Sequence, residues 1–385
     1  MSGKRYGRKP LIASISILAV ALAGIAFAVV PTSHSSSVSA VTVTTVGVGP
    51  ISVGPSQSGA STIAEFNGIA CPNSKDCIGV GSARSGRGSI ATSADGGRTW
   101  GAAAVPKLAK SLTSVSCLRQ RFCVAVGDAT ILKSIDHGKT WRVSSHDVPN
   151  QPILSVDCSG SDECLTAGFD PSTQGAARGE IHRSLDGGST WQAVSLPGAA
   201  FGLGSVTCPT ALECIAVGDS IFFTKDAGFT WKAGSVPLGF GTLSSVSCAN
   251  AYDCVAVGPN AASASDPSLP ANAVETLDGG QSWKPVSMPL ASGSIRSVSC
   301  NPRGCLAAGS GMAVGQPAVF LARSGSSSSF ARVPGPRSMT FLGSVLCRQS
   351  SGCISVGTAA TNAMAAVQTT SSSSWSVARL VGGTR

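Results

Sequence analysis

The chain has 385 residues, of which 12% are charged and 43% hydrophobic, with 46 glycines, 14 cysteines and a formal net charge of +9. The four basic residues of the first 30 account for four of these charges, which leaves a mild +5 on the rest of the chain. No cluster of Lys and Arg is interleaved with aromatic residues, so the composition argues against nucleic acid as a partner. Low charge and abundant glycine and serine favour a sheet-rich protein with many turns.

The first 30 residues predict an export signal. Basic residues at 4, 5, 8 and 9 precede an uncharged apolar run over 11–30. Twenty apolar residues can span a bilayer as a signal anchor, whereas the small residues Val38-Ser39-Ala40 offer a cleavage site, and both alternatives stay open. In either case the remainder of the chain is delivered outside, secreted or anchored in the membrane. Residues 31–61, rich in Ser, Thr and Gly, are predicted to be a linker.

An eight-residue pattern, S/T-x-D-x-G-x-S/T-W, recurs along the rest of the chain, and we call it the box. The box carboxylate is expected to accept hydrogen bonds from backbone N–H groups one to three residues further on, and the Gly two residues after it to supply a positive φ. The Trp is an apolar plate suited to packing between sheets. Two degraded copies, 323–330 and 368–375, place Phe330 and Trp375 at the Trp position. The five full copies contain Asp95, Asp136, Asp186, Asp226 and Asp278, followed by Trp100, Trp141, Trp191, Trp231 and Trp283.

The cysteines form a second repeat of seven close pairs with none left over. Each pair is preceded by one short strand and followed by another, so it is expected to close the hairpin between them. Because the chain carries an export signal and each pair is local, we predict one disulfide per hairpin. Zinc is the alternative, but each unit offers two thiols and no His at ligand spacing, so we predict no metal. The predicted disulfides join Cys71 to Cys77, Cys117 to Cys123, Cys158 to Cys164, Cys208 to Cys214, Cys248 to Cys254, Cys300 to Cys305 and Cys347 to Cys353.

Together the two repeats define a unit of strand, Cys hairpin, strand, variable connection, strand, box and strand. Seven such units of about 40–50 residues predict an all-β, seven-bladed β-propeller of four-stranded antiparallel blades over 62–385, with a linear solenoid as the alternative. Each unit has all four strands, so the ring can close by packing of whole blades. An additional closing strand from 41–55 stays open.

The box resembles the Asp-box, or BNR, repeat of sialidases and related β-propellers. That resemblance implies a fold signature on a turn remote from any active site. It does not extend to catalysis, because the only tyrosine after the leader is Tyr252, inside a Cys hairpin, and the sialidase nucleophile is a tyrosine. Xyloglucanase-like Asp-box hydrolases use two opposed Asp residues between two propellers, and this chain is long enough for one. In repeat number, size and topology the chain also resembles the photosystem II assembly factors, exported seven-bladed Asp-box propellers that act by binding a membrane protein. The paired Cys of every blade depart from that family's pattern.

Strand parity separates two ends of the propeller. The Cys hairpins and boxes share one end, and the variable connections share the other, where binding function is expected. The predicted connections span 79–90, 168–181, 258–275, 309–320 and 357–367, while blades two and four have almost none. Candidate binding residues on these connections are Asp170, Arg178, Glu180, His182, Asp266 and Glu275; Asp128 and Asp219 are expected to be turn residues, and Asp157 to face either the channel or an edge.

No serine-hydrolase, metalloprotease or nucleotide-binding motif is present, so no catalytic residue and no cofactor is predicted. We therefore predict an exported, noncatalytic binding or scaffold module, a monomer, with a protein or glycan partner at the cell surface. A glycoside hydrolase with an unrecognised active site is the alternative.

Overall fold

The structure is a computed structural model. It describes residues 63–118, 121–144, 151–171, 178–198, 200–237, 241–259, 272–289, 294–311, 316–325, 327–349, 352–359, 362–369 and 374–379. The predicted leader, linker and closing strand lie outside these residues. Within the described ranges, no helix has the length and hydrophobicity that a membrane span requires.

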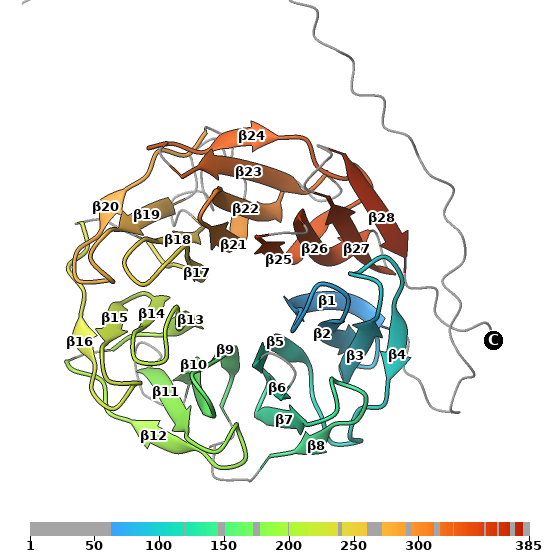
Figure 1. Cartoon of the computed structure of the whole chain (residues 1–385), viewed down its shortest axis with the longest axis horizontal. Helices are drawn as coiled ribbons and strands as arrows, with labels where there is room; N and C mark the ends of the chain where they lie inside the picture. Colours follow the sequence, from blue (N-terminus) through green and yellow to red (C-terminus); the bar gives the residue numbers. More distant parts are fainter. Residues whose placement is uncertain are drawn as a thin grey trace, which may run out of the picture. The chain divides into compact units, whose positions relative to one another are not determined.

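Twenty-eight strands form seven four-stranded antiparallel sheets, each made of four consecutive strands, and the sheets are arranged as blades around a ring (Figure 1). Blades 1–3 contain β1 (Ile63–Ala70), β2 (Cys77–Ala83), β3 (Gly88–Ser93), β4 (Gly101–Ala103); β5 (Leu112–Leu118), β6 (Phe122–Gly127), β7 (Thr130–Ser134), β8 (Arg142–Val143); β9 (Ile153–Ser159), β10 (Glu163–Asp170), β11 (Arg178–Ser184) and β12 (Gln192–Val194). Blades 4 and 5 contain β13 (Leu203–Thr207), β14 (Cys214–Gly218), β15 (Ile221–Thr224), β16 (Lys232–Ala233); β17 (Ser245–Cys248), β18 (Cys254–Gly258), β19 (Asn272–Thr276) and β20 (Lys284–Pro285). Blades 6 and 7 contain β21 (Ser294–Asn301), β22 (Gly304–Ser310), β23 (Val319–Ser324), β24 (Ala331–Val333); β25 (Phe341–Arg348), β26 (Gly352–Ala359), β27 (Asn362–Gln368) and β28 (Trp375–Arg379).

The predicted propeller is confirmed, and the solenoid alternative is wrong because blade 7 packs against blade 1. Phe66 and Trp100 of blade 1 share a buried cluster with Ile354 and Val356 of blade 7. The Arg348 guanidinium of blade 7 also donates to backbone carbonyls at positions 73 and 74 of blade 1. Whole blades therefore close the ring by packing, since no sheet mixes strands from the two ends of the described chain.

The hydrophobic core is divided into the interfaces between neighbouring blades. On the third strand of each blade, alternate side chains face the preceding and the following blade, as the period of a β-strand requires. In blade 3, Ile181 faces blade 4, where it packs with Leu203 and Phe222. The box Trp of each blade faces the preceding blade, so Trp231 joins this same cluster. The predicted role of the box Trp as a plate between sheets is thus confirmed for these blades.

All seven predicted disulfides are present, one at each hairpin between the first and second strands. The Cα atoms of each pair lie between 3.9 and 4.1 Å apart. Disulfides of this number indicate an oxidising compartment outside the cytoplasm. The bonded pairs are Cys71 and Cys77, Cys117 and Cys123, Cys158 and Cys164, Cys208 and Cys214, Cys248 and Cys254, Cys300 and Cys305, and Cys347 and Cys353.

The predicted place of each pair at the hairpin between two strands is confirmed, and several cysteines also belong to the strands themselves. Cys123, Cys164, Cys305 and Cys353 are the second residues of β6, β10, β22 and β26. Each is the direct ladder partner of the cysteine to which it is bonded.

The physical reason is that the ladder continues beyond the disulfide toward the turn. Leu118 pairs with Phe122 one step past the bond of blade 2, and Asn301 pairs with Gly304 in the same way in blade 6. Blade 7 has a corresponding pair between positions 348 and 352. The disulfide of these blades therefore links two paired strands and does not itself close the turn. Cys123 is buried, whereas Cys305 and Cys353 are half-buried.

The box forms the predicted tight turn, but its hydrogen bonds differ from the expectation. In blade 3 one Asp186 carboxylate oxygen accepts the backbone N–H of Ser189, three residues further on as predicted, and that of Thr190, which lies one residue beyond the predicted range. The nearer N–H, that of Gly188, donates to the Ser184 hydroxyl, because Gly187 and Gly188 both take positive φ and turn this group inward. The first Ser or Thr of the box is thus the buried acceptor of the turn.

Asp186→Ala is expected to lower the free energy of unfolding by about 1–2 kcal/mol without unfolding the ring. The substitution removes the acceptor of four donors of the turn, including the Thr190 hydroxyl at 2.6 Å. The cost stays modest because the released N–H groups are exposed and can bond to water. Urea denaturation of the purified variant measures the change. A variant as stable as the parent would show that the carboxylate does not hold this turn.

The degraded sixth box replaces both polar residues of the turn. Arg323 occupies the position of the first Ser or Thr, and Gly325 the position of the Asp. The Arg323 Nε donates to the Ser327 carbonyl at 2.6 Å, and its Nη2 donates to the Glu275 carboxylate of blade 5 at 2.5 Å. An arginine that bonds both within the turn and to the neighbouring blade thus substitutes for the missing carboxylate.

Several predicted variable connections are shorter than expected because the strands extend into them. The predicted connection over 357–367 consists mostly of β26 and β27, which leaves 360–361 between them. Likewise β10 continues to Asp170 and β11 begins at Arg178, so 171–177 remain of the predicted 168–181. Small residues such as Ala363 and Ala365 are fully buried between blades there, although their sequence has the composition of a loop.

Candidate binding site

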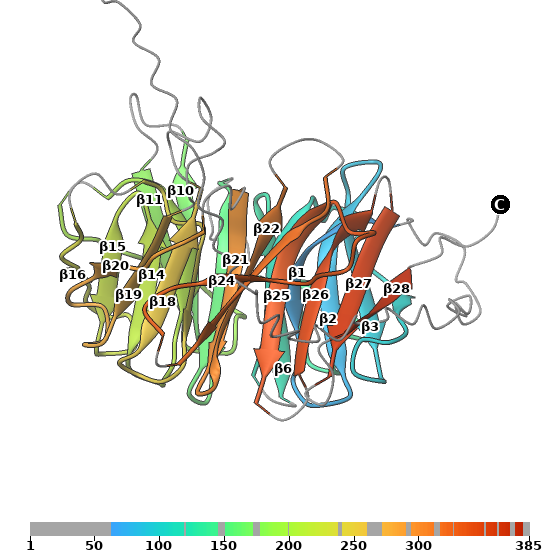
Figure 2. The same ribbon diagram turned by 90° about the horizontal axis from the view of Figure 1, so that it is seen from above.

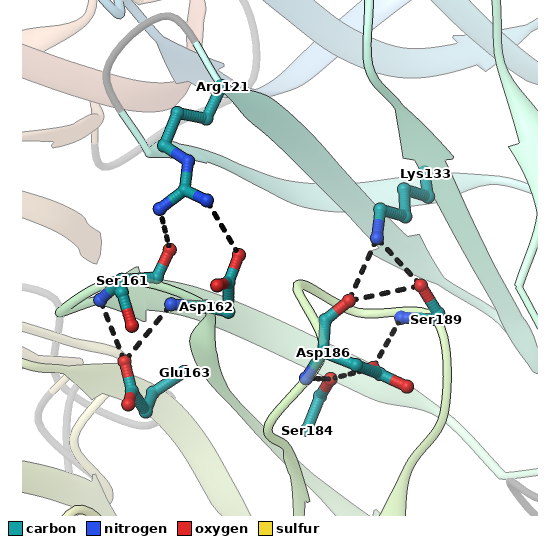
Figure 3. Close-up of polar contacts among 8 residues, drawn as sticks. All are labelled: Arg121, Lys133, Ser161, Asp162, Glu163, Ser184, Asp186 and Ser189. Carbon is teal, nitrogen blue, oxygen red and sulfur yellow. Dashed lines mark hydrogen bonds and ion pairs between the residues drawn. The ribbon is translucent and has the colours of Figure 1, made fainter.

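The two ends of the propeller differ, as Figure 2 shows in side view. Box turns donate backbone N–H groups to Cys-hairpin carbonyls of the same blade, for example Gly187 to Asp162 at 2.8 Å and Gly279 to Tyr252 at 3.2 Å. We call this end the hairpin face. Its hairpins also contact one another, since Arg121 of blade 2 donates to the Ser161 carbonyl of blade 3 at 2.9 Å (Figure 3). The opposite end, where the second and third strands connect, is the loop face.

Blade 3 brings four of the predicted residues together toward the loop face. Asp170 ends β10 and is the ladder partner of Arg178, which begins β11. Glu180 and His182 follow on β11, two residues apart, and therefore project to the same side of the sheet. Their Oε2 and Nε2 atoms lie 4.0 Å apart. The prediction placed these residues on a loop, but β10 and β11 hold them in a rigid ladder.

Burial sets the protonation of this pair. Burial raises the pKa of Glu180 and the charge of Asp170 raises it further, whereas a hydrogen bond from the Gln151 side chain and the charge of Arg178 lower it. Burial also lowers the pKa of His182, which is 4% exposed. The Glu180 Oε2 and the His182 Nε2 are buried without a hydrogen-bond partner. At neutral pH the imidazole is therefore uncharged, and the carboxyl holds its proton more readily than an exposed one.

His182 occupies a position that is apolar in every other blade, a signal that the sequence contained. It lies two residues before the first position of the box. It faces blade 2 in the middle of an inter-blade contact, where a histidine replaces a hydrophobic side chain. The corresponding residues of the other blades are Ala91, Leu132, Phe222, Val274, Leu321 and Ala366.

The two candidates of blade 5 do not join the blade 3 cluster. Asp266 lies outside the described residues. Glu275 lies within β19, directly before the box and thus near the hairpin face, where it pairs with Arg323. Its placement on a loop-face connection was wrong, because the strand continues to Thr276. The contact with Arg323 gives its charge a structural partner.

Asp157 connects three blades on the wall of the central channel. Its carboxylate accepts the Cys208 N–H of blade 4 at 2.8 Å, and the Ser116 hydroxyl of blade 2 donates to it at 3.0 Å. In blades 2, 5 and 6 a serine occupies this position; the Ser299 hydroxyl, for example, accepts the Cys347 N–H at 2.8 Å. Burial raises the pKa of Asp157, and hydrogen bonds from these neighbours partly offset that rise. Asp157 therefore has a structural role, because its hydrogen bonds link blade 3 to blades 2 and 4.

Asp128 and Asp219 lie in the short turns of blades 2 and 4. The Asp128 N–H and carbonyl both bond within the turn region, to Ser111 and Thr130. The Asp219 carboxylate accepts the Thr242 hydroxyl of the next blade. Over the part of the chain that the structure describes, no three His, Cys, Asp or Glu side chains gather in a way that could hold a metal ion.

The class of the protein is thus an all-β seven-bladed propeller with one disulfide in each blade. No protein-family model matches the chain, and no curated protein matches it. The structure is similar to that of YCF48 bound to a D1 peptide, with 14% identity, a TM-score of 0.54, and coverage of 77% of this chain and 92% of that chain. YCF48 from Cyanidioschyzon merolae gives 16% identity and a TM-score of 0.55, covering 77% of this chain and 94% of that chain.

The GH74 xyloglucanase from Xanthomonas campestris is also similar, with 13% identity and a TM-score of 0.61 over 86% of this chain and 55% of that chain. This chain therefore spans about half of that enzyme. At these identities the likeness shows the propeller fold alone. One of these solved propellers is bound to a peptide, and another is a glycoside hydrolase.

Proposed function

We propose that the protein is an exported, noncatalytic propeller that acts as a monomer and binds a partner protein at the cell surface through its loop face. The observation that carries this proposal is the difference between the two ends. The hairpin face is fixed by disulfides and box turns, whereas the loop face has connections of unequal length. The peptide bound to YCF48 supports a protein partner over a glycan.

The blade 3 cluster is the part of the loop face best suited to bind. Asp170 and Arg178 present opposite charges at the end of the β10–β11 ladder, and Glu180 follows behind them. Residues 171–177 connect these strands, and the ladder gives them a rigid base. Binding loops on rigid scaffolds commonly have this arrangement.

Shortening this connection is expected to preserve folding and to reduce partner binding at least tenfold. Residues 171–177 would be replaced by the two-residue turn that joins β6 to β7, because Gly127 and Thr130 show that a blade closes with this turn. Cross-linking mass spectrometry of the full chain at the surface of its own cells would identify the partner and quantify its capture. Tyr252→Ala, an exposed change on the hairpin face, is the control. If partner capture were lost in Tyr252→Ala but kept by the shortened variant, binding would lie on the hairpin face and the proposal would be contradicted.

A glycoside hydrolase is the second candidate function, favoured by Glu180. Burial raises the pKa of this carboxyl, and its interaction with Asp170 provides the second carboxylate that hydrolysis needs. Release of reducing ends from xyloglucan or sialylated glycans by the parent, and its loss in Glu180→Gln, would favour this function. We expect the parent to release none.

A further inference from the structure

The junction between blades 3 and 4 is open at its outer edge, where two later junctions are closed by backbone hydrogen bonds. Between blades 4 and 5, Ser235 forms a parallel bridge with Ser282, and the Trp283 N–H donates to the Ser235 carbonyl at 3.0 Å. Between blades 5 and 6, Ser287 and Ser329 form the same bridge.

The equivalent residues of blades 3 and 4 are Ser195 and Thr230, and among the described residues no such bridge joins them. A cavity of about 480 Å³ lies between them instead. Its volume falls in the range of about 300–1,000 Å³ that is common for ligand sites. The cavity is lined by Arg183, Val194, Leu196, Pro197, Phe229 and Trp231, together with neighbouring backbone.

Two buried side chains at this cavity carry N–H groups without an acceptor. Arg183 is 8% exposed, and its Nε and Nη1 have no hydrogen-bond partner. Trp231 is 5% exposed, and its indole N–H is also unpartnered. In four other boxes the indole donates to the carbonyl of the box Gly, as Trp283 does to Gly280 at 3.1 Å. Buried donors without acceptors are costly, so their presence at one cavity indicates a missing acceptor.

The nearest acidic group does not supply that acceptor. The charge of Asp226 acts on Arg183, but the Asp226 oxygens already accept hydrogen bonds from Thr224 and Thr230. The guanidinium carbon instead lies 3.4 Å from the centroid of the Phe229 ring, a cation–π contact that leaves its N–H edge unbonded. The guanidinium keeps its positive charge, as arginine does in proteins.

Lys133 of blade 2, the other cation at the position equivalent to Arg183, is bonded to the next blade. Its ammonium group donates to the Asp186 carbonyl at 2.9 Å and to the Ser189 hydroxyl at 2.7 Å, both in the box of the next blade (Figure 3). This cation therefore fastens blade 2 to blade 3. Arg183 makes no corresponding bond to the box of blade 4, so its donors remain for another partner.

The chemistry of the cavity defines its ligand. A planar guanidinium recognises a carboxylate through two parallel hydrogen bonds, and the apolar side chains of Val194, Leu196 and Phe229 suit hydrophobic flanks. At the two closed junctions the segment after the outer strand bonds to the box backbone of the next blade. We propose that the open junction binds an extended peptide segment of a partner protein that presents an acidic side chain to Arg183. This inference rests on the proposed function, since it specifies a second surface for the same protein partner.

Titration of the ¹⁵N-labelled full chain with two matched peptides tests this proposal. The probes are acetyl-Val-Glu-Val-amide and acetyl-Val-Gln-Val-amide, followed by the indole N–H signal of Trp231, which Trp231→Phe assigns. We expect saturable movement of this signal with the Glu peptide and at least tenfold weaker binding of the Gln peptide. Equal binding of the two peptides, or no movement of the signal, would overturn the proposal.

Substitutions of the two equivalent cations provide matched controls. Arg183→Leu is expected to weaken binding of the Glu peptide at least tenfold, and Lys133→Leu to leave it unchanged. Arg183→Lys, which keeps the charge and loses the planar fork, should bind with intermediate affinity and serves if the leucine variant fails to fold. Unchanged binding in Arg183→Lys and Arg183→Leu would contradict the assignment.

Sodium acetate separates a peptide site from a general carboxylate site. If acetate moves the Trp231 signal as strongly as the Glu peptide at equal concentration, the site is not selective for peptide and the proposal fails. The result is also independent of the loop-face experiment. If the peptide binds at the junction but shortening 171–177 has no effect on partner capture, the proposed binding through the loop face is rejected and the peptide site at the junction is not.

Discussion

Arg323→Ala is expected to lower the free energy of unfolding by about 3 kcal/mol, because it leaves a buried carboxylate without its partner. The Arg323 and Glu275 side chains are 7% and 18% exposed and connect blades 5 and 6. Burial raises the pKa of the neighbouring Asp253, which the charge of Arg323 lowers and the charge of Glu275 raises. Without the arginine, two acidic groups would face each other in a partly dry site. Urea denaturation at pH 7 measures the loss.

The double variant Arg323→Leu with Glu275→Leu is the control for this prediction. Replacing both members of a buried ion pair by apolar residues is often neutral or stabilising, so the double variant should be more stable than Arg323→Ala. The difference isolates the cost of the unpaired charge. A loss below about 1 kcal/mol in Arg323→Ala would mean that water reaches Glu275.

Acidification from pH 7 to pH 5 is expected to destabilise the protein through His182, with a slope approaching about 1.4 kcal/mol per pH unit. Burial lowers the pKa of His182, so the folded state binds its proton less readily than the unfolded chain does. Stability is therefore complete above the ordinary histidine pKa and is lost as the pH falls below it. The raised pKa of Glu180 acts in the opposite direction, because as the pH falls toward the ordinary carboxyl pKa the folded state binds this proton before the unfolded chain does.

His182→Leu should flatten this dependence, because leucine already fills the equivalent positions 132 and 321. Thermal unfolding at several pH values between 5 and 8 would compare the variant with the parent. Glu180→Gln, measured in parallel, separates the contribution of the carboxyl. Identical slopes for His182→Leu and the parent would show that His182 is protonated in the folded state as easily as in the unfolded one.

The sequence predicted the blades because two independent repeats mark two turns in each of them. The Cys pair marks the turn between the first and second strands, and the box marks the turn between the third and fourth. It predicted the connections poorly, because small residues such as Ala363 fill tight contacts between blades and do not show the alternation of a half-buried strand. Glu275 was misplaced because its strand, β19, continues to the first residue of the box with no turn residue before it. Candidate residues on β10 and β11 were identified by charge, yet the burial of His182 could not be predicted, because it arises from packing between sheets that no local pattern specifies.

Two features could have been identified by aligning the units on the box. His182 is then the one polar residue at a position that is apolar in the other blades. Arg183 aligns with Lys133 and Glu275, which both bond to the following blade. Their significance needed the structure, because the sequence does not show that the equivalent lysine bonds to the next box while the arginine does not.

Because every blade is built from four consecutive strands, the order of the blades along the chain and their order around the ring are the same. Each hairpin can therefore oxidise with its own two cysteines before any later blade exists. The contact of the first blade with the last is the one long-range step of assembly. A circular permutation that joined blade 7 to blade 1 and opened the chain between two other blades would leave every sheet and every contact between neighbouring blades intact.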